Sequence, residues 1–388
     1  MQLGKRRRCP AAGRGAVLPA ALVAALAAAP PARADQQVDA TYHYFGDSVG
    51  NSIDSWVADF RQSLGGPWSL ALRGMLDRVH LPPLPGLPGS QENVDAITTA
   101  SRPVESAVLS KESYTKQREE LTGSLHWQPH DRRVRLSGSY YVSHESDFLG
   151  QQVSATLGRD WNGGASALAL RGAFGFDRIH PDEHTGGDPT ARHRATLDVT
   201  GTWVQSLSPR AQGQIGVEFT TVNGYQSNPY RKVYAGGQPL PETHPESRVR
   251  GALFGQVDRW LTTRASVSFG ARYYADDWGI QAGTFDAIFN QYLGDHLIVR
   301  YRYRYHVQSA ASFYRDLYAS ASGVDGYRTA DYKLQDFDSN LFGIKVSVPI
   351  ESRRAWLDGL LVDFKYERYF DSHSFAANVL ETGMSWPF

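Results

Sequence analysis

Three arginines at alternate positions stand out in this 388-residue chain as residues whose spacing suggests chemistry. Arg300, Arg302 and Arg304 would share one face of a strand, because successive side chains of a strand point to opposite faces. A row of guanidinium groups lining a lumen could focus an anion. The alternative is a set of ion pairs with carboxylates of the same wall, and the sequence favours this structural network.

Carboxylate and imidazole groups gather at two other places. Residues 180–184 read HPDEH, with Asp188 close by, and such side chains suit several divalent ions. The spacing matches no defined metal site, so a solvated loop is the favoured interpretation. Asp276, Asp277 and Asp286 could hold a hard cation, although aspartates at strand ends more often accept hydrogen bonds from loops.

No grouping of residues predicts catalysis. Ser143 and His144 are sequence neighbours, so on a strand they point to opposite faces and cannot act as a nucleophile and its base. The only cysteine is Cys9, near the N-terminus, which excludes disulfides, cysteine metal sites and thioether-linked haem from the rest of the chain. We predict no enzyme, no cofactor and no metal site.

The first 34 residues are typical of a secretory signal peptide. Basic residues at 5–8 precede an Ala- and Leu-rich stretch at 16–29, and small residues flank a cut before Asp35. The apolar stretch is too short for a spanning helix. The mature chain, residues 35–388, keeps 34 basic and 40 acidic residues, which does not indicate a nucleic-acid partner.

Alternation of apolar and polar residues dominates the mature chain. In residues 296–308 one face carries Leu, Val and Tyr, and the other carries the three arginines, which would be costly against lipid and are therefore expected to face a lumen. Residues 360–367 repeat the pattern, with Asp363, Lys365 and Glu367 on the lumen-facing side. Arg368 then falls on the apolar face, which predicts the membrane rim or a bulge. A soluble sandwich could show the same alternation in one strand.

The connections between such segments alternate between short and long. Short turns are expected near residues 64–67, 129–132, 162–164, 208–210, 262–264 and 293–295, and the longest loops at 81–114, 180–192, 228–248 and 309–336. Outer-membrane barrels have this asymmetry, with short periplasmic turns and long outer loops. We predict an all-β protein, a transmembrane antiparallel β-barrel of about sixteen strands, with fourteen to eighteen remaining open. Loops 81–114 and 309–336 are long enough to fill the lumen.

The end of the chain supports the same architecture. Counting back from the aromatic Phe388, Trp386, Met384 and Leu380 make a mostly apolar face. This face is similar to the signal read by the barrel-assembly machinery, although Pro387 is an unusual neighbour. We therefore expect the assembly machinery, outer-membrane lipid and lipopolysaccharide as partners.

Five segments resemble a bacterial family catalogued as a domain of unknown function, DUF3570. They read VDAITTAS at 94–101, GYQSNPY at 224–230, DDWGI at 276–280, SAASFY at 309–314 and ADYKL at 330–334. The likeness extends over essentially the mature chain and implies a barrel in the outer membrane of a Gram-negative bacterium, with no settled activity. Two functions stay open: a porin-like channel or gated pore for a small polar solute, or a non-enzymatic structural or docking component of an envelope redox system with a periplasmic partner.

Overall fold

A computed structural model describes residues 36–81, 114–129, 133–181, 190–294, 296–352 and 359–387. The predicted signal peptide, residues 1–34, and Phe388 lie outside the described residues. The regular structure is almost entirely β-strand, which confirms the period-two pattern of the sequence. Among the residues described, no helix has the length and apolar character needed to cross a membrane.

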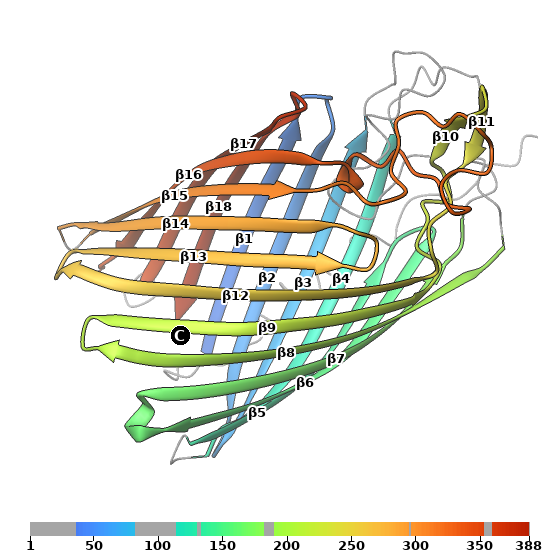
Figure 1. The fold of residues 1–388 in the computed structure, drawn as a ribbon. Coiled ribbons are helices and arrows are strands. Elements are labelled where there is room, and N and C mark those ends of the chain that lie inside the picture. The colour runs from blue at the N-terminus through green and yellow to red at the C-terminus, as the bar shows by residue number, and fades with distance from the viewer. Residues whose placement is uncertain are drawn as a thin grey trace, which may run out of the picture.

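Sixteen antiparallel strands of the described chain form one closed barrel (Figure 1). Each strand pairs with its neighbours along the chain. The strands are β1 (Gln36–Asp47), β2 (Ser52–Gly65), β3 (Trp68–Leu81), β4 (Tyr114–Trp127), β5 (Val134–His144), β6 (Phe148–Trp161), β7 (Ser166–Ile179), β8 (Arg192–Ser208), β9 (Ala211–Gly224), β12 (Ser247–Thr262), β13 (Ala265–Asp276), β14 (Gln281–Leu293), β15 (Leu297–Gln308), β16 (Phe337–Ile350), β17 (Leu360–Asp371) and β18 (Ala376–Pro387). The prediction of about sixteen strands is confirmed.

The barrel is closed by antiparallel pairing of its first and last strands. Gln37 of β1 lies opposite Pro387 of β18, and the pairing continues to Asp47 and Ala377. Closure leaves no unpaired edge in the wall, which is the arrangement a sheet needs to satisfy its backbone groups within lipid. A two-sheet sandwich, the alternative for a single strand, is thereby excluded.

Short and long connections lie at opposite ends of the barrel. The links at 66–67, 162–165, 209–210 and 263–264 join strands at the end where β1 begins and β18 finishes, here called the short-turn end. The links between β7 and β8, β9 and β12, and β15 and β16 lie at the other end, here called the long-loop end. The predicted asymmetry of the connections is confirmed.

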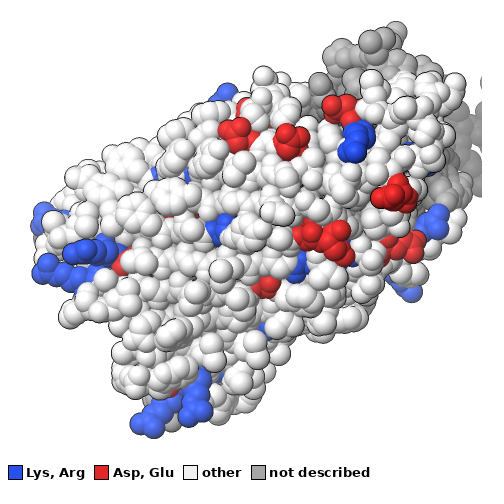
Figure 2. Space-filling model, in the orientation of Figure 1, with Lys and Arg blue, Asp and Glu red and all other residues white. Residues whose placement is uncertain are grey.

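Large apolar side chains occupy the outer face of the wall. Examples are Val217 of β9, Leu253 of β12, Phe269 of β13 and Phe342 of β16, each about half exposed. Figure 2 shows the face formed by the front strands of Figure 1, where the wall between the two ends is largely free of charge and Lys and Arg gather at the short-turn end. An apolar belt around a closed barrel is the surface that lipid requires.

The rim of β17 follows the sequence prediction without a bulge. Arg368 lies on the outer face, where it pairs in continuous register with Phe342 of β16 and Asn378 of β18. Its Nη1 donates a 3.0 Å hydrogen bond to Oδ1 of Asn378. Since the register does not shift here, there is no bulge. Arg368 lies close to the long-loop end of β17, and this position at the rim explains why a charged side chain is tolerated on the outer face.

Two long connections fold together into a layer at the long-loop end, here called the cover (Figure 1). It comprises residues 225–246, with the hairpin of β10 (Lys232–Ala235) and β11 (Gln238–Pro241), and residues 309–336, with the 3-10 helix η3 (Tyr332–Leu334). Gly236 and Gly237 form the two-residue hairpin turn with φ angles of 60° and 76°. Such turns need left-handed backbone, which glycine adopts without strain.

Backbone hydrogen bonds join the two parts of the cover. The amides of Thr243 and Arg328 each donate to the carbonyl of the other at 2.9 Å. Gly236 donates to Tyr318, and Tyr318 donates to Tyr234, both at 3.0 Å. The cover is therefore one folded unit made of segments that are far apart in the sequence.

A small apolar core fixes the cover to the barrel rim. Trp278 and Ile280, from the turn between β13 and β14, are buried against Ala311, Phe313 and Leu334 of the cover. The ring centroids of Trp278 and Phe313 lie 5.3 Å apart in an edge-to-face arrangement, which aromatic pairs favour. The tip of the β13–β14 hairpin is therefore a contact site that attaches the cover to the barrel rim.

Candidate functional site

The three arginines of β15 lie on the face of the wall opposite to the exposed Tyr301 and Tyr305. Arg302 bridges two carboxylates, at 3.2 Å from Asp286 of β14 and 3.1 Å from Glu367 of β17. Arg304 shares Asp286 at 2.9 Å, and Arg300 donates to the amide oxygen of Asn290 at 2.9 Å. Two of the three arginines are therefore ion-paired, which corresponds to the structural network and not to a free basic ladder.

The predicted residues of β17 extend this network. Asp363 accepts from Lys345 of β16 at 2.9 Å, and Lys365 lies 2.6 Å from Glu381 of β18. Glu367, which receives Arg302, also lies 3.6 Å from Lys365. Oppositely charged side chains of neighbouring strands thus form ion pairs on the inner wall, and this pairing lowers the cost of holding the charges there.

The described residues of the predicted assembly signal follow one face of β18. Leu380 and Met384 are exposed among the apolar side chains of the outer face, and Trp386, half-buried, pairs with Val38 of β1. Phe388 lies outside the described residues. Recognition by the assembly machinery stays a prediction.

The candidate cation ligands are accounted for by hydrogen bonds. Asp276 accepts from the backbone amides of Trp278 and Ile280 and from Arg248, while Asp277 accepts from the amide of Val249. Asp286 is the ion-pair partner of the β15 arginines. No group of three metal-ligating side chains occurs in the part of the chain that the structure describes, and residues 182–189 of the HPDEH loop lie outside it.

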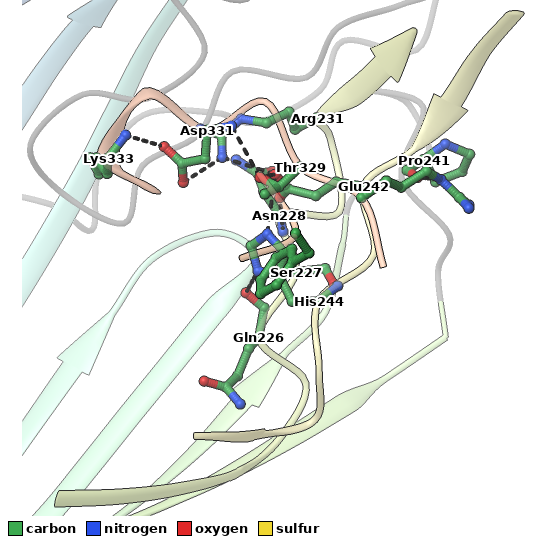
Figure 3. A network of polar contacts seen from close by, with 12 residues as sticks. Gln226, Ser227, Asn228, Arg231, Pro241, Glu242, His244, Thr329, Asp331 and Lys333 are labelled. Carbon is green, nitrogen blue, oxygen red and sulfur yellow. Dashed lines mark hydrogen bonds and ion pairs between the residues drawn. The ribbon is translucent and has the colours of Figure 1, made fainter. Parts of the chain in front are cut away.

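A buried polar cluster holds the two parts of the cover together (Figure 3). The guanidinium of Arg231, 2 % exposed, lies 2.6 Å from Asp331 and 3.3 Å from Glu242. Glu242 also accepts from the hydroxyl of Thr329 at 2.6 Å and lies 3.3 Å from Nε2 of His244. These five residues come from both segments, so their side-chain contacts join the segments in addition to the backbone hydrogen bonds.

The electrostatics of the cluster keep Glu242 ionised. Burial alone would raise the pKa of this carboxyl. The positive charge of Arg231, the adjacent imidazole of His244 and the hydrogen bond from Thr329 outweigh burial and lower the pKa from 4.5 to about 2. The cluster is therefore built around a permanent negative charge at ordinary pH.

A second buried cluster ties the cover to the barrel. The phenol of Tyr230 donates to Asp147, in the turn between β5 and β6, at 2.7 Å. Lys116 of β4 contacts the same carboxylate at 2.5 Å and Glu145 at 2.7 Å, with only 3 % of its side chain exposed. The cover is thus fixed at two points on the rim, through Tyr230 on one side and Trp278 on another.

A cavity of about 610 Å³ lies between the cover and the inner wall. Six barrel strands, β8, β9, β12, β13, β14 and β15, contribute to it, and the cover contributes Gln226, His244, Asp331, Lys333 and Leu334. The barrel side chains are Arg194, Thr196, Asp198, Thr220, Val222, Arg248, Arg250, Arg272, Tyr274, Ala282, Thr284, His306 and Gln308, with Trp278 and Ile280 from the rim. The site is therefore polar and rich in arginine.

Three of the four arginines at the cavity have carboxylate partners. Arg194 lies 2.7 Å from Asp177, Arg248 lies 2.5 Å from Asp276, and Arg272 contacts Glu218. The plane of Arg248 also lies over the Trp278 ring, at 4.1 Å from its centroid, a favourable cation–π distance. Such pairs hold the guanidinium groups in place at the edge of the cavity.

The sequence pattern predicted a functional role for Arg300, Arg302 and Arg304 but not for the cavity arginines. Arg248 and Arg250 alternate within one strand, a signal that the same period-two reasoning could have found. Arg194 alternates with Arg192 in β8, whereas β13 contains the single arginine Arg272, and the register between strands brings Arg194 and Arg272 to the same cavity.

These features define the class of protein. A closed antiparallel barrel with an apolar outer belt, a charged and paired inner wall, and long connections at one end is a transmembrane β-barrel of the outer-membrane type. The model of the family described as "Protein of unknown function (DUF3570)" matches residues 186–374. The resemblance predicted from the sequence is confirmed there, and no catalytic family is indicated.

Several solved barrels are similar to this chain. A ferric enterobactin receptor mutant (PfeA) from Pseudomonas aeruginosa is 12 % identical, with a TM-score of 0.45, 88 % of this chain and 54 % of the receptor covered. A BenF-like porin from Pseudomonas fluorescens Pf-5 is 10 % identical, with a TM-score of 0.44 and coverage of 91 % and 98 %. OccAB3 of Acinetobacter baumannii is 10 % identical, with a TM-score of 0.43 and coverage of 91 % and 99 %.

The chain spans about half the length of the receptor structures that it matches. No curated protein matches the sequence.

Proposed function

We propose that the protein lies in the outer membrane and passes a small polar solute through its lumen, with the cover acting as a gate. The observation that carries this proposal is the cavity of about 610 Å³ between the inner wall and the cover, lined by polar groups of both. A cavity with a polar lining is suited to a hydrated solute.

The construction of the cover supports a gating role. Its two segments are held to each other by backbone pairing and by the Arg231 cluster, and to the rim by the apolar core around Trp278 and the contact of Tyr230 with Asp147. Separation of the two segments at these contacts would open the cover while leaving the barrel wall paired.

An engineered crosslink tests this proposal. Thr243 and Arg328 pair through two backbone hydrogen bonds, so their replacement by cysteines, Thr243→Cys with Arg328→Cys, places two thiols at a separation suited to a disulfide. The chain without its predicted signal peptide has no other cysteine. Oxidation would fix the two segments of the cover together.

The readout is ion current through the purified full barrel in a planar bilayer. We expect current from the reduced double variant and at least a several-fold smaller current after oxidation, with no redox effect on the parent chain. Absence of current from the parent and from both redox states would refute the proposal. Equal currents in the oxidised and reduced states would refute the gating role.

A further inference from the structure

Arg250 is the cation of the cavity that lacks a partner among the described residues. Its side chain lines the cavity, and its Nε is shielded from solvent without a hydrogen-bond acceptor. In the sheet Arg250 lies opposite Thr220 of β9 and Asp276 of β13. A guanidinium carries five donors and is always charged, so leaving its donors unused in a partly enclosed site costs free energy.

The nearest carboxylate by register is already occupied. Asp276 accepts from Arg248 at 2.5 Å, from the phenol of Tyr274 at 2.8 Å, and from the amides of Trp278 and Ile280. With these four donors the carboxylate has little acceptor capacity left. Arg250 therefore lies next to the Asp276 carboxylate, whose acceptor sites are used by other donors.

The two carboxylates that line the cavity are also engaged. Asp198 accepts from the hydroxyl of Thr220 at 2.7 Å, and Asp331 lies 2.6 Å from Arg231 of the cover. The cavity lining holds four arginines and Lys333 against these two acids. Donors thus exceed the acceptors that the protein supplies around Arg250.

Neighbouring groups are placed to complete a receptor for a negatively charged ligand. Arg194, Arg248 and Arg272 each give one carboxylate contact within the wall, which uses at most two of the five donors of a guanidinium. Thr284 and Gln308 add a hydroxyl and an amide from β14 and β15. Guanidinium groups recognise carboxylate and phosphate oxygens through paired, parallel hydrogen bonds.

We propose that the cavity binds a small oxyanion, a carboxylate or a phosphate, with Arg250 as its principal ligand. The anion supplies hydrogen-bond acceptors for Arg250 that the protein does not provide. Ion pairs with Asp177, Asp276 and Glu218 fix the positions of the surrounding arginines. This inference deepens the proposed function, because it names the class of solute, but the binding itself does not depend on conduction.

Calorimetric titration of the detergent-solubilised full barrel tests the proposal, with succinate and inorganic phosphate as separate probes. We expect saturable binding of at least one probe, at least tenfold weaker in Arg250→Gln and weakened to a smaller extent in Arg250→Lys, which keeps the charge and loses the fork. The matched control is Arg300→Gln, whose contact is with Asn290 outside the cavity. It should bind as the parent does.

Binding of neither probe, or equal affinity in the parent and Arg250→Gln, would overturn the proposal. A heat-modifiable shift in gel mobility checks that each variant is a folded barrel, and Arg250→Lys provides the comparison if Arg250→Gln fails this check. Binding without bilayer current would support the oxyanion site while refuting conduction. Current without binding of either probe would refute the site and leave conduction standing.

Discussion

Arg231 and Asp331, one hundred positions apart in the chain, meet at 2.6 Å inside the cover, where the guanidinium is 2 % exposed. The same guanidinium reaches Glu242 at 3.3 Å. One cation therefore balances two carboxylates from different segments of the cover. The integrity of this layer depends on a positive charge of one segment that pairs with carboxylates of both.

Replacing this cation should loosen the cover and leave the barrel intact. Arg231→Met leaves Glu242 and Asp331 buried without their shared partner, and removing one member of a buried pair costs about 3–5 kcal/mol. We expect faster amide hydrogen exchange in residues 225–246 and 309–336, with strand amides unchanged. Arg135→Met is the control, because its 2.6 Å pair with Asp160 is exposed and should contribute about 0–1 kcal/mol. Unchanged exchange in the cover would contradict the role assigned to Arg231.

Acid should open the cover through Glu242. The pKa of this carboxyl is lowered to about 2 in the folded protein, so its contribution to stability is complete above about pH 4.5 and is lost as the pH falls through about 2. The shift corresponds to on the order of 3 kcal/mol. Spin labels on Gln238→Cys and Ser322→Cys, both exposed in the cover, should show a broadened distance distribution over this range.

The control for the acid experiment is Glu242→Gln, which keeps the size of the side chain and removes its titration. The variant should show a distance distribution that no longer changes between pH 4.5 and 2. If the parent and Glu242→Gln broadened alike, another group would be responsible for the acid response.

A charge on the outer face should be far more costly than the same charge on the inner face. Val217, 57 % exposed in the middle of β9, belongs to the apolar belt, so Val217→Arg should destabilise the barrel by about 2–4 kcal/mol in lipid. Gln214→Arg, on the opposite face of the same strand, should cost less than about 1 kcal/mol. Urea titration of refolding into vesicles measures both, and similar losses would argue against the assigned faces of β9.

Gly216, in the middle of β9, has no room for a side chain. A methyl group at Gly216 would overlap the ring of Phe254 and stand 2.8 Å from the carbonyl oxygen of Gly201, so Gly216→Ala should destabilise the barrel by about 1–3 kcal/mol. Gly172→Ala is the matched control, because a methyl there meets nothing within 4 Å. Thermal loss of the compact gel form compares the two, and equal stabilities would show that Phe254 can move aside.

The strands were predictable from the sequence because their signal is local. The alternation expected over residues 296–308 corresponds to β15, Leu297–Gln308, and the positions of the short turns agree with the structure. A period of two within one strand is enough to assign both faces, whatever the neighbouring strands do. Asp286 shows where this reasoning stops, since its role as partner of Arg302 depends on the register between β14 and β15.

The cover and the cavity could not be predicted in this way. Glu242 and Thr329 are 87 positions apart in loops without periodicity, so nothing in the sequence indicates that they form a hydrogen bond. Arg194, Arg250 and Arg272 belong to three strands, and their meeting at one cavity follows from pairing offsets that the residue pattern leaves open. The two faces of the wall follow from the sequence, while the tertiary arrangement determines that Arg250 is left without an acceptor for its Nε.

The seam between β1 and β18 has a kinetic consequence. Most neighbouring strands are joined through a nearby turn, but here Gln37 reaches Ser385 across 348 positions of chain. Contacts between such distant residues have the largest loop-closure cost and form late. Until they form, two strand edges with unpaired amides and carbonyls stay open to other chains. A free peptide copying β18 should therefore compete for the edge of β1 during assembly, and should have no access to it once the barrel has closed.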